Sequence, residues 1–248
     1  MVGIIIFFAI VLSIIIVLVS RPMKIPREPD REGAEDSAAL QAYYRASRWP
    51  IFIFERFIVL KSLAKIGPKG WLIDIGSGPG FLAAKISQKF PDSKVVGLDI
   101  NNLTLENAKR TWLPDLYPEL EFINADALKM PFPNNSVDCI VSSLSLHHWQ
   151  NAQAVFDEIF RTLKPGGEFL IFDLTRDSPV YFYWALKIGQ AVFAPKAIRN
   201  INGAVGSFWA AYTPCEIKAT VRKFQVDNFQ IKSRFGWMFI SGVKPKKS

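Results

Sequence analysis

Residues 71–81 read WLIDIGSGPGF, an apolar run that ends in three closely spaced glycines. A helix-like stretch, FLAAKISQKF, occupies 81–90. An apolar strand, a glycine turn and a helix form the entry to a nucleotide-binding βαβ unit, because glycine turns the chain at positive φ and lets a ligand approach the backbone. The stretch therefore predicts a ligand site at the end of a strand, and the surrounding residues must identify the ligand.

The residues after this loop alternate between strand-like and helix-like segments. Strands are expected at 71–75, 94–99, 120–125, 137–144 and 167–174, and helices at 80–90, 102–112 and 151–163. Such alternation is typical of an α/β fold, with a parallel sheet covered by helices on both faces.

The C-terminal part departs from this alternation. YTPCEIKATVRKF predicts a helix with Thr213 as N-cap and Glu216 completing a capping box. Two strands, 229–235 and 237–244, follow with only Gly236 between them. That gap is too short for a helical crossover, so we expect an antiparallel hairpin.

The N-terminus is strongly apolar. Residues 2–19, VGIIIFFAIVLSIIIVLV, carry no charge, and at about 1.5 Å per residue they would span roughly 27 Å, close to the hydrocarbon thickness of a bilayer. We interpret residues 1–20 as a transmembrane anchor; a cleaved signal peptide is the alternative, although no basic region precedes the apolar run. Arg21, Lys24 and Arg27 follow it, so the positive-inside bias predicts a single-pass membrane protein whose body lies in the cytoplasm.

The rest of the chain is expected to be a linker and one domain. Residues 21–37 are rich in proline and charge, which indicates a linker. The domain, 38–248, opens with one or two helices broken by Pro50.

The charge and the cysteines limit the partners of the protein. The net charge of +8 suits an anionic lipid surface. It would also suit nucleic acid, but no basic run is interleaved with aromatic residues, so we expect no nucleic-acid partner. Cys139 and Cys215 give neither a disulfide framework nor the spacing of a metal site, and we expect no bound metal.

Three carboxylates and the glycine spacing indicate the ligand. A dinucleotide site requires G-x-G-x-x-G, whereas this loop has G-x-G-x-G with Phe81 in place of the third glycine. Asp74 suits a ligand with a positive amine, and Asp99, about twenty residues after the glycines, suits two ribose hydroxyls. Asp126 with Ala127 suits an adenine. Groups for an amino acid, a ribose and an adenine, with none for phosphates, predict S-adenosylmethionine (SAM).

Successive motifs resemble those of class I SAM-dependent methyltransferases, over about residues 70–175: DIGSGPG, GLDI, NADALKMPFPNNSVDCIVSS and LHHW…LKPGGEFLIFD. They most resemble the small-molecule group that includes the ubiquinone/menaquinone C-methyltransferases. The resemblance implies a Rossmann-like, seven-stranded, mostly parallel sheet of order 3-2-1-4-5-7-6. It also implies the cofactor-binding residues: Asp74, Gly76, Ser77, Gly78 and Gly80 toward the methionine part, Asp99 and Ile100 toward the ribose, Asp126 and Ala127 toward the adenine, and Ser143 beside the amino acid end.

The two histidines of the chain, His147 and His148, are the candidate catalytic residues. They follow the fourth strand, where an imidazole could accept a proton near neutral pH. A base is needed only if the acceptor arrives protonated, because SAM carries its own leaving group. Packing or positioning is the alternative role for the pair.

Residues 176–212 form an insertion that contains eight aromatic residues. It indicates a lid over an apolar substrate, a second membrane contact, or a cap that buries its own aromatic side chains. Together with the anchor, it predicts a membrane-anchored SAM-dependent methyltransferase acting on a small lipophilic acceptor such as a quinone precursor, lipid, phenol or thiol. The alternatives are a non-catalytic SAM-binding partner protein, or a methyltransferase acting on RNA or protein.

Overall fold

The computed structural model describes residues 20–23, 25–29, 37–112, 115–200 and 203–246. The predicted anchor therefore lies outside the described residues, except for Ser20. Within the described ranges, none of the helices combines the length and the apolar character needed to cross a membrane.

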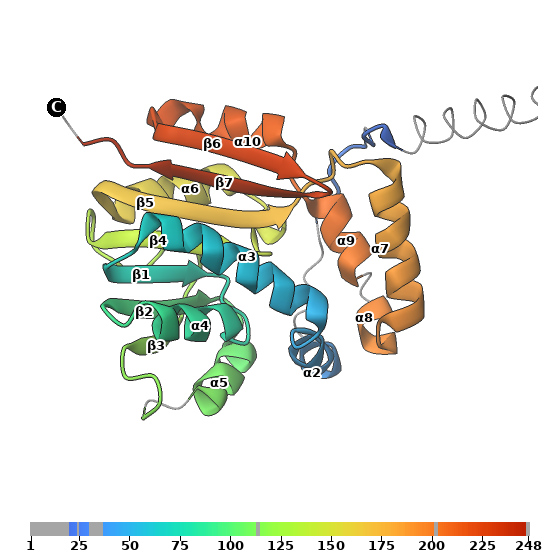
Figure 1. Ribbon diagram of the computed structural model, residues 1–248, viewed down its shortest axis with the longest axis horizontal. Coiled ribbons are helices and arrows are strands. Elements are labelled where there is room, and N and C mark those ends of the chain that lie inside the picture. Colours follow the sequence, from blue (N-terminus) through green and yellow to red (C-terminus); the bar gives the residue numbers. More distant parts are fainter. Residues whose placement is uncertain (1–19, 24, 30–36, 113–114, 201–202, 247–248) are drawn as a thin grey trace, which may run out of the picture.

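A single mixed sheet forms the centre of the fold (Figure 1). Its strands are β1 (Gly70–Ile75), β2 (Ser93–Asp99), β3 (Leu120–Asn124), β4 (Val137–Ser143), β5 (Leu163–Leu174), β6 (Asp227–Arg234) and β7 (Trp237–Val243). They are ordered β3-β2-β1-β4-β5-β7-β6, and β7 runs antiparallel to both β5 and β6. The predicted strand order and the C-terminal hairpin are confirmed.

Helices follow the strands as the alternation predicts. The described helices are α2 (Ser37–Ala46), α3 (Pro50–Ile66), α4 (Phe81–Lys89), α5 (Asn102–Thr111), α6 (Ala152–Thr162), α7 (Val180–Phe193), α8 (Lys196–Asn200), α9 (Gly203–Ala210) and α10 (Pro214–Val221), with short 3₁₀ turns η1 (Leu146–His148) and η2 (Arg222–Phe224). Pro50 begins α3, where its missing N–H leaves no helix bond unmade. The capping box of Thr213 and Glu216 is present at the start of α10.

Both faces of the sheet are buried, which explains why its parallel strands are apolar without alternation. On one face, Phe156 and Ile159 of α6 and Ile217 of α10 pack against β1, β4 and β5. On the other face, Val59 of α3 and Ile86 of α4 pack against the same strands, and α5 contributes Leu105 and Ala108 to this second cluster. Helices therefore cover two faces and leave the strand ends for a site.

The N-terminal segment and the insertion are joined at one corner of the molecule, beside the start of α7 (Figure 1). Pro22 forms an isolated antiparallel bridge with Pro179, and the amide of Val180 donates to the carbonyl of Arg21 at 3.1 Å. Residues 25–29 continue along the insertion, where the amide of Glu28 donates to the carbonyl of Trp209. This part of the predicted linker is thus bonded to the domain.

Candidate functional site

The carboxyl ends of five strands meet at one edge of the sheet. Register fixes their alignment, since Ile75 of β1 lies beside Leu98 of β2 and Ser142 of β4, and Asp99 lies beside Asn124 of β3. The last residues of these strands and the loops that follow them carry all the predicted site residues. The fold therefore brings the glycine loop, Asp99, Asp126 and the histidine pair to the same edge.

Asp99 connects the glycine loop to the next helix. Its Oδ2 accepts from the amide of Gly78 at 2.7 Å, and its Oδ1 accepts from the amide of Asn101 at 2.8 Å. Burial raises the pKa of Asp99, and the backbone N–H groups that donate to it act in the opposite direction. The carboxylate is therefore held by the backbone at the end of β2, as expected of a group that presents oxygens to a ligand.

The three glycines of the loop have different surroundings. All of them adopt positive φ, but a Cβ on Gly80 would lie 2.6 Å from the ring of Phe122, and one on Gly76 would lie 2.1 Å from Ser145 Oγ. A Cβ on Gly78 would meet only Tyr43, at 3.8 Å. Gly76 and Gly80 thus serve packing, whereas Gly78 faces space that a ligand can approach.

A small cavity of about 40 Å³ lies between the glycine loop and helices α2 and α3. Asp74 lines it with its side chain 1% exposed, and Asp74 Oδ2 has no hydrogen-bond partner among the described residues. Ser77 Oγ, also in the lining, is equally without a described partner. Burial raises the pKa of Asp74 well above its usual range, and the charge of Glu55 adds to the effect. A buried acceptor without a donor indicates that this cavity receives a polar or cationic group.

Glu55 is a site residue that the sequence analysis missed. It lies on α3, is buried, and accepts a hydrogen bond from Ser143 Oγ, so it joins the predicted Ser143 to the cavity. Burial raises the pKa of Glu55 to about 7, although the bond from Ser143 and the charge of Arg56 lower it. A signal was present in the sequence, because Glu55 shares the buried helical stripe of Val59 and Leu63 at a spacing of four residues.

His147 is buried beside a carboxylate that was not predicted either, and His148 is half-buried next to it. His147 Nδ1 lies 2.8 Å from Asp173 Oδ1, and the His147 amide donates to Asp173 Oδ2 at 2.9 Å. The imidazole rings of His147 and His148 are 4.1 Å apart, and burial lowers the pKa of His148 to about 2. With Nδ1 engaged by Asp173, only Nε2 of His147 is left to exchange a proton. Neither imidazole lines the small cavity.

The residues predicted to hold an adenine lie further along the edge. Asp126 is exposed, and its Oδ1 accepts from the amide of Leu128 at 2.8 Å, which closes a turn after β3. Ala127 packs partly into the core, and Ile100 is exposed. These side chains flank the open end of β2 and β3 rather than the small cavity.

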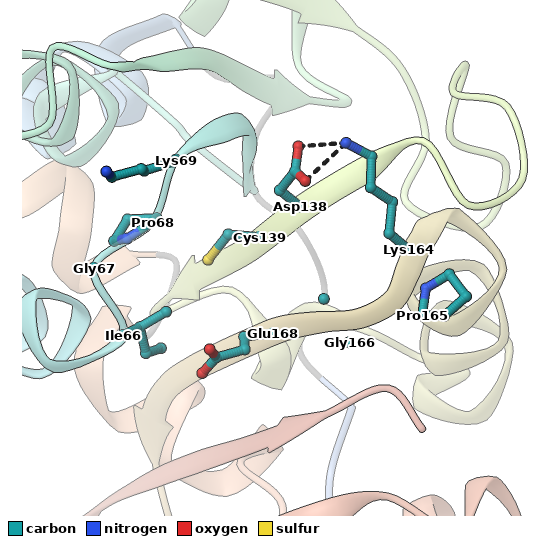
Figure 2. A pocket seen from close by; sticks show the side chains of 11 residues that line it. Ile66, Gly67, Pro68, Lys69, Asp138, Cys139, Lys164, Pro165, Gly166 and Glu168 are labelled. Carbon is teal, nitrogen blue, oxygen red and sulfur yellow. Dashed lines mark hydrogen bonds and ion pairs between the residues drawn. The ribbon is translucent and has the colours of Figure 1, made fainter. Parts of the chain in front are cut away.

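A larger cavity of about 220 Å³ lies at the opposite, amino-terminal ends of β1, β4 and β5. Figure 2 shows Asp138 paired with Lys164 there, and Asp138 Oδ2 also accepts from the amide of Trp71 at 2.9 Å. Asp138 and Lys164 are therefore engaged with one another, and Asp138 also with the backbone. None of the predicted site residues lines it.

Residues 73–171 match the family described as methyltransferase domain. This segment is therefore similar in sequence to methyltransferase domains, among whose known members are enzymes that use SAM. The match begins at the strand before the glycine loop and ends within β5. The matched segment therefore contains the whole edge described above except for α2, α3 and Asp173.

Known proteins similar to the chain include two C-methyltransferases. The ubiquinone/menaquinone biosynthesis C-methyltransferase of Pseudomonas putida is 31% identical over 158 residues, which cover 63% of this chain and 61% of that protein. The sterol 24-C-methyltransferase of Aspergillus fumigatus is 38% identical over 103 residues, which cover 41% of this chain and 27% of that protein. The chain thus spans less than two thirds of the length of either relative.

Solved structures share the fold over nearly the whole chain. A putative S-adenosyl-L-methionine-dependent methyltransferase from Methanococcus maripaludis superposes with a TM-score of 0.64 at 21% identity, over 91% of this chain and 98% of that chain. The plantazolicin methyltransferase, solved with a desmethyl analogue and S-adenosylhomocysteine (SAH), superposes with a TM-score of 0.64 at 14% identity. The superposition covers 85% of this chain and 91% of that chain. The fold of the methyltransferase domain is therefore established beyond the segment that matches the family.

Proposed function

We propose that the protein transfers a methyl group from SAM to a small lipophilic acceptor while residues 1–20 hold it at a membrane. The observation that carries the proposal is the pair of buried carboxyl groups, Glu55 and Asp74, beside the glycine loop. SAM carries an ammonium and a sulfonium, and both are suited to a buried carboxylate that lacks a partner.

The residues present fit this cofactor. Asp99 offers two carboxylate oxygens at the end of β2 for ribose hydroxyls, and Gly78 allows close approach to the backbone. Ser143 and Ser77 would contact the amino acid end, and Asp126 with Ala127 the adenine. Ligand pockets for molecules of this size usually measure about 300–1,000 Å³. The cavity is smaller, so we expect side chains of α2 and α3 to move aside on binding.

Methyl transfer from SAM does not require a covalent intermediate with the protein. SAM supplies an activated methyl group, and the chain orients it and excludes water. The imidazole of His147, oriented by Asp173, would take a proton at Nε2 from an acceptor that arrives protonated. His148 would line the same region as a neutral imidazole, because the pKa of its ring is low.

The acceptor is proposed to be apolar and to enter beneath residues 176–212. Helix α9 of this insertion packs against η1, which carries the two histidines. The relatives whose names mention ubiquinone, menaquinone and sterol support a lipophilic acceptor and carbon as the methylated atom. The apolar residues 2–19 would keep the protein where such acceptors concentrate.

Calorimetry and a turnover assay test this function. Purified full-length protein should bind SAM and not NAD, and Asp99→Ala should weaken SAM binding strongly, because a buried ribose would lose a charge-assisted acceptor. A screen of quinone precursors, phenols, thiols and sterols should then reveal formation of S-adenosylhomocysteine. Binding of NAD without SAM would refute the cofactor. Binding of SAM without turnover on any acceptor class would favour a non-catalytic partner protein.

A further inference from the structure

Helix α7 presents an outward face that is almost entirely apolar. Its exposed side chains are Tyr181, Trp184, Ala185, Lys187, Ile188, Ala191, Val192 and Phe193. The large ones are far from buried, with Trp184 50%, Ile188 58% and Phe193 71% exposed. Positions 181, 184, 188 and 192 follow the helical repeat, so they form one stripe along the helix. A stripe of this kind on a free surface marks an interaction site.

The stripe is not needed to attach α7 to the domain. The opposite face of the helix does this, since the ring of Phe182 packs against Trp237 and Phe208, and Tyr183 packs against Phe208 and Trp209. Figure 1 shows α7 at the margin of the molecule, with α9 between it and the sheet. The aromatic side chains of α7 thus form two sets: Phe182 and Tyr183 pack against the rest of the domain, whereas Tyr181, Trp184 and Phe193 are exposed.

The N-terminal apolar segment joins the structure at one end of this stripe. The description begins at Ser20, and residues 21–23 are bonded to residues 178–180 at the start of α7. The amide of Met23 donates to Ser178 at 2.9 Å, and the amide of Val180 donates to Arg21 at 3.1 Å. The described chain therefore enters the domain at Ser20, beside the start of α7, and the 14 residues of α7 extend from there for about 21 Å at 1.5 Å per residue.

Every charged side chain on helices α7, α8 and α9 is a cation. No Asp or Glu occurs between Asp177 and Glu216, whereas Lys187, Lys196 and Arg199 fall within this range. The ammonium of Lys187 lies 5.0 Å from the ring centroid of Trp184, so its alkyl chain runs along the apolar face while its charge stays at the rim. An apolar face with a cationic rim complements the interface of an anionic bilayer.

We propose that the outward face of α7 lies on an anionic phospholipid bilayer, with the helix in the plane of the membrane. The inference rests on the proposed membrane attachment by residues 1–20 and adds a second, independent contact. In a bilayer, the apolar stripe would contact the acyl chains while the cations contact anionic headgroups. A second copy of the chain would bring the same cations against one another.

Spin labels on full-length protein test the contact. Cys215→Ser removes the exposed native thiol, and Ile188→Cys places one label on the stripe. Lys89→Cys is the matched control, since it is exposed at the end of α4. The protein is reconstituted into phosphatidylcholine vesicles with and without phosphatidylserine. Relaxation of each label by oxygen, which partitions into lipid, is compared with relaxation by a water-soluble nickel chelate.

The expected result is selective: the label at 188 responds to oxygen and loses its response to nickel, more so with phosphatidylserine, while the label at 89 responds to nickel. Equal nickel access at both positions would overturn the contact even if the vesicles carry the protein on flotation, which would leave the anchor intact. Broadening between labels at 188 that disappears on dilution with unlabelled protein would assign the stripe to a second copy. A short distance between a label at position 188 and a second label introduced by Ile10→Cys would show that residues 2–19, and not the bilayer, cover the stripe. Failure to float would refute attachment by either element, while calorimetry on the same sample still tests SAM binding.

Discussion

Glu55 and Asp74 place two carboxyl groups in a cavity too small to hydrate them well. Burial is the main cause of the raised pKa of both groups; the charge of Glu55 adds to the rise at Asp74, and the charge of Asp173 adds to the rise at Glu55. A cationic ligand reverses this balance because it favours the ionised forms. The two residues therefore couple binding of the proposed cofactor to proton release.

Affinity for SAM should rise with pH. The pKa of Glu55 is about 7 in the folded, ligand-free protein, so the ionised form that binds a cation increases roughly tenfold in population between pH 6 and pH 8. Stability of the ligand-free protein should change in the other direction, because a carboxyl group with a raised folded-state pKa loses its contribution as pH rises through that pKa. Calorimetry across this range measures the affinity. Glu55→Gln should flatten the profile, Glu121→Gln on the exposed side of β3 should not, and a steep profile in Glu55→Gln would transfer the role to Asp74.

Two glycine substitutions should separate binding from folding. Gly78→Ala adds a methyl group at φ +51° that would make only an ordinary contact with Tyr43, at 3.8 Å, so we expect about 1–2 kcal/mol of lost stability from the backbone conformation and a severe loss of SAM affinity. Gly80→Ala drives a methyl group against Phe122, so folding itself should fail. Thermal unfolding and calorimetry distinguish the two. SAM binding retained in a folded Gly78→Ala protein would show that the cofactor approaches elsewhere.

At the scale of elements, Arg176 links three separate pieces of chain. Its guanidinium donates to the carbonyls of Ile25 and Ala211 and forms a two-point ion pair with Glu216. The N-terminal segment, the end of the insertion and the start of α10 are thus held by one buried side chain. The capping role of Glu216 adds α10 itself to this connection.

Arg176→Met should therefore destabilise the protein by about 3 kcal/mol, because it breaks an ion pair whose arginine is buried and leaves two carbonyls without their donor. Lys223→Met is the matched control. Lys223 pairs with Asp157 at 2.6 Å on the surface, with both side chains about half exposed, and its loss should cost less than about 1 kcal/mol. Denaturant unfolding measures both. Equal effects would mean that the Arg176 connection is dispensable.

The insertion should show a division of roles between its tryptophans. Trp209 is half-buried on α9, which packs against the turn carrying the histidines, whereas Trp184 points outward from α7. Trp209→Ala should raise KM for a lipophilic acceptor about thirtyfold, since about 2 kcal/mol of apolar contact is lost, with SAM affinity nearly unchanged. Trp184→Ala should leave KM for a detergent-solubilised acceptor unaltered. If Trp209→Ala loses SAM binding and folding together, the ring belongs to the core.

The strands, their order and the glycine loop were predictable because their signals are local. An apolar run followed by DIGSGPG specifies a strand, a turn and a helix from neighbouring residues, and Gly236 alone between two strands leaves only a hairpin. Glu55 and Asp173 were not assigned, because their partners lie 88 and 26 residues away and meet them only after the sheet has formed. Each nevertheless stands as a lone carboxylate in an otherwise apolar stripe, and that pattern identifies a buried charge.

At the scale of the whole molecule, the described domain should not depend on residues 1–19 for folding but should depend on residues 21–29. Arg27 donates to the carbonyls of Ala210 and His147 and stacks over Tyr212 at 4.1 Å. A chain without residues 1–19 should therefore unfold at the same denaturant concentration as the full chain. A chain without residues 1–29 should lose at least about 2 kcal/mol, since hydrogen bonds to a charged group are removed. Equal stability of the two shortened chains would contradict this account.

The bonds between residues 21–23 and 178–180 have a mechanical consequence. A domain joined to a membrane anchor by a flexible linker rotates freely. Its catalytic edge then faces the membrane only part of the time. Here the backbone immediately after Ser20 is bonded to residues 178–180 by two hydrogen bonds and a bridge, so residues 21–23 do not act as a free linker. If residues 1–20 anchor the protein as proposed, this connection would restrict the orientation of the domain relative to the membrane. Diffusion of an apolar molecule in two dimensions could then deliver it to the same side of the fold on every encounter.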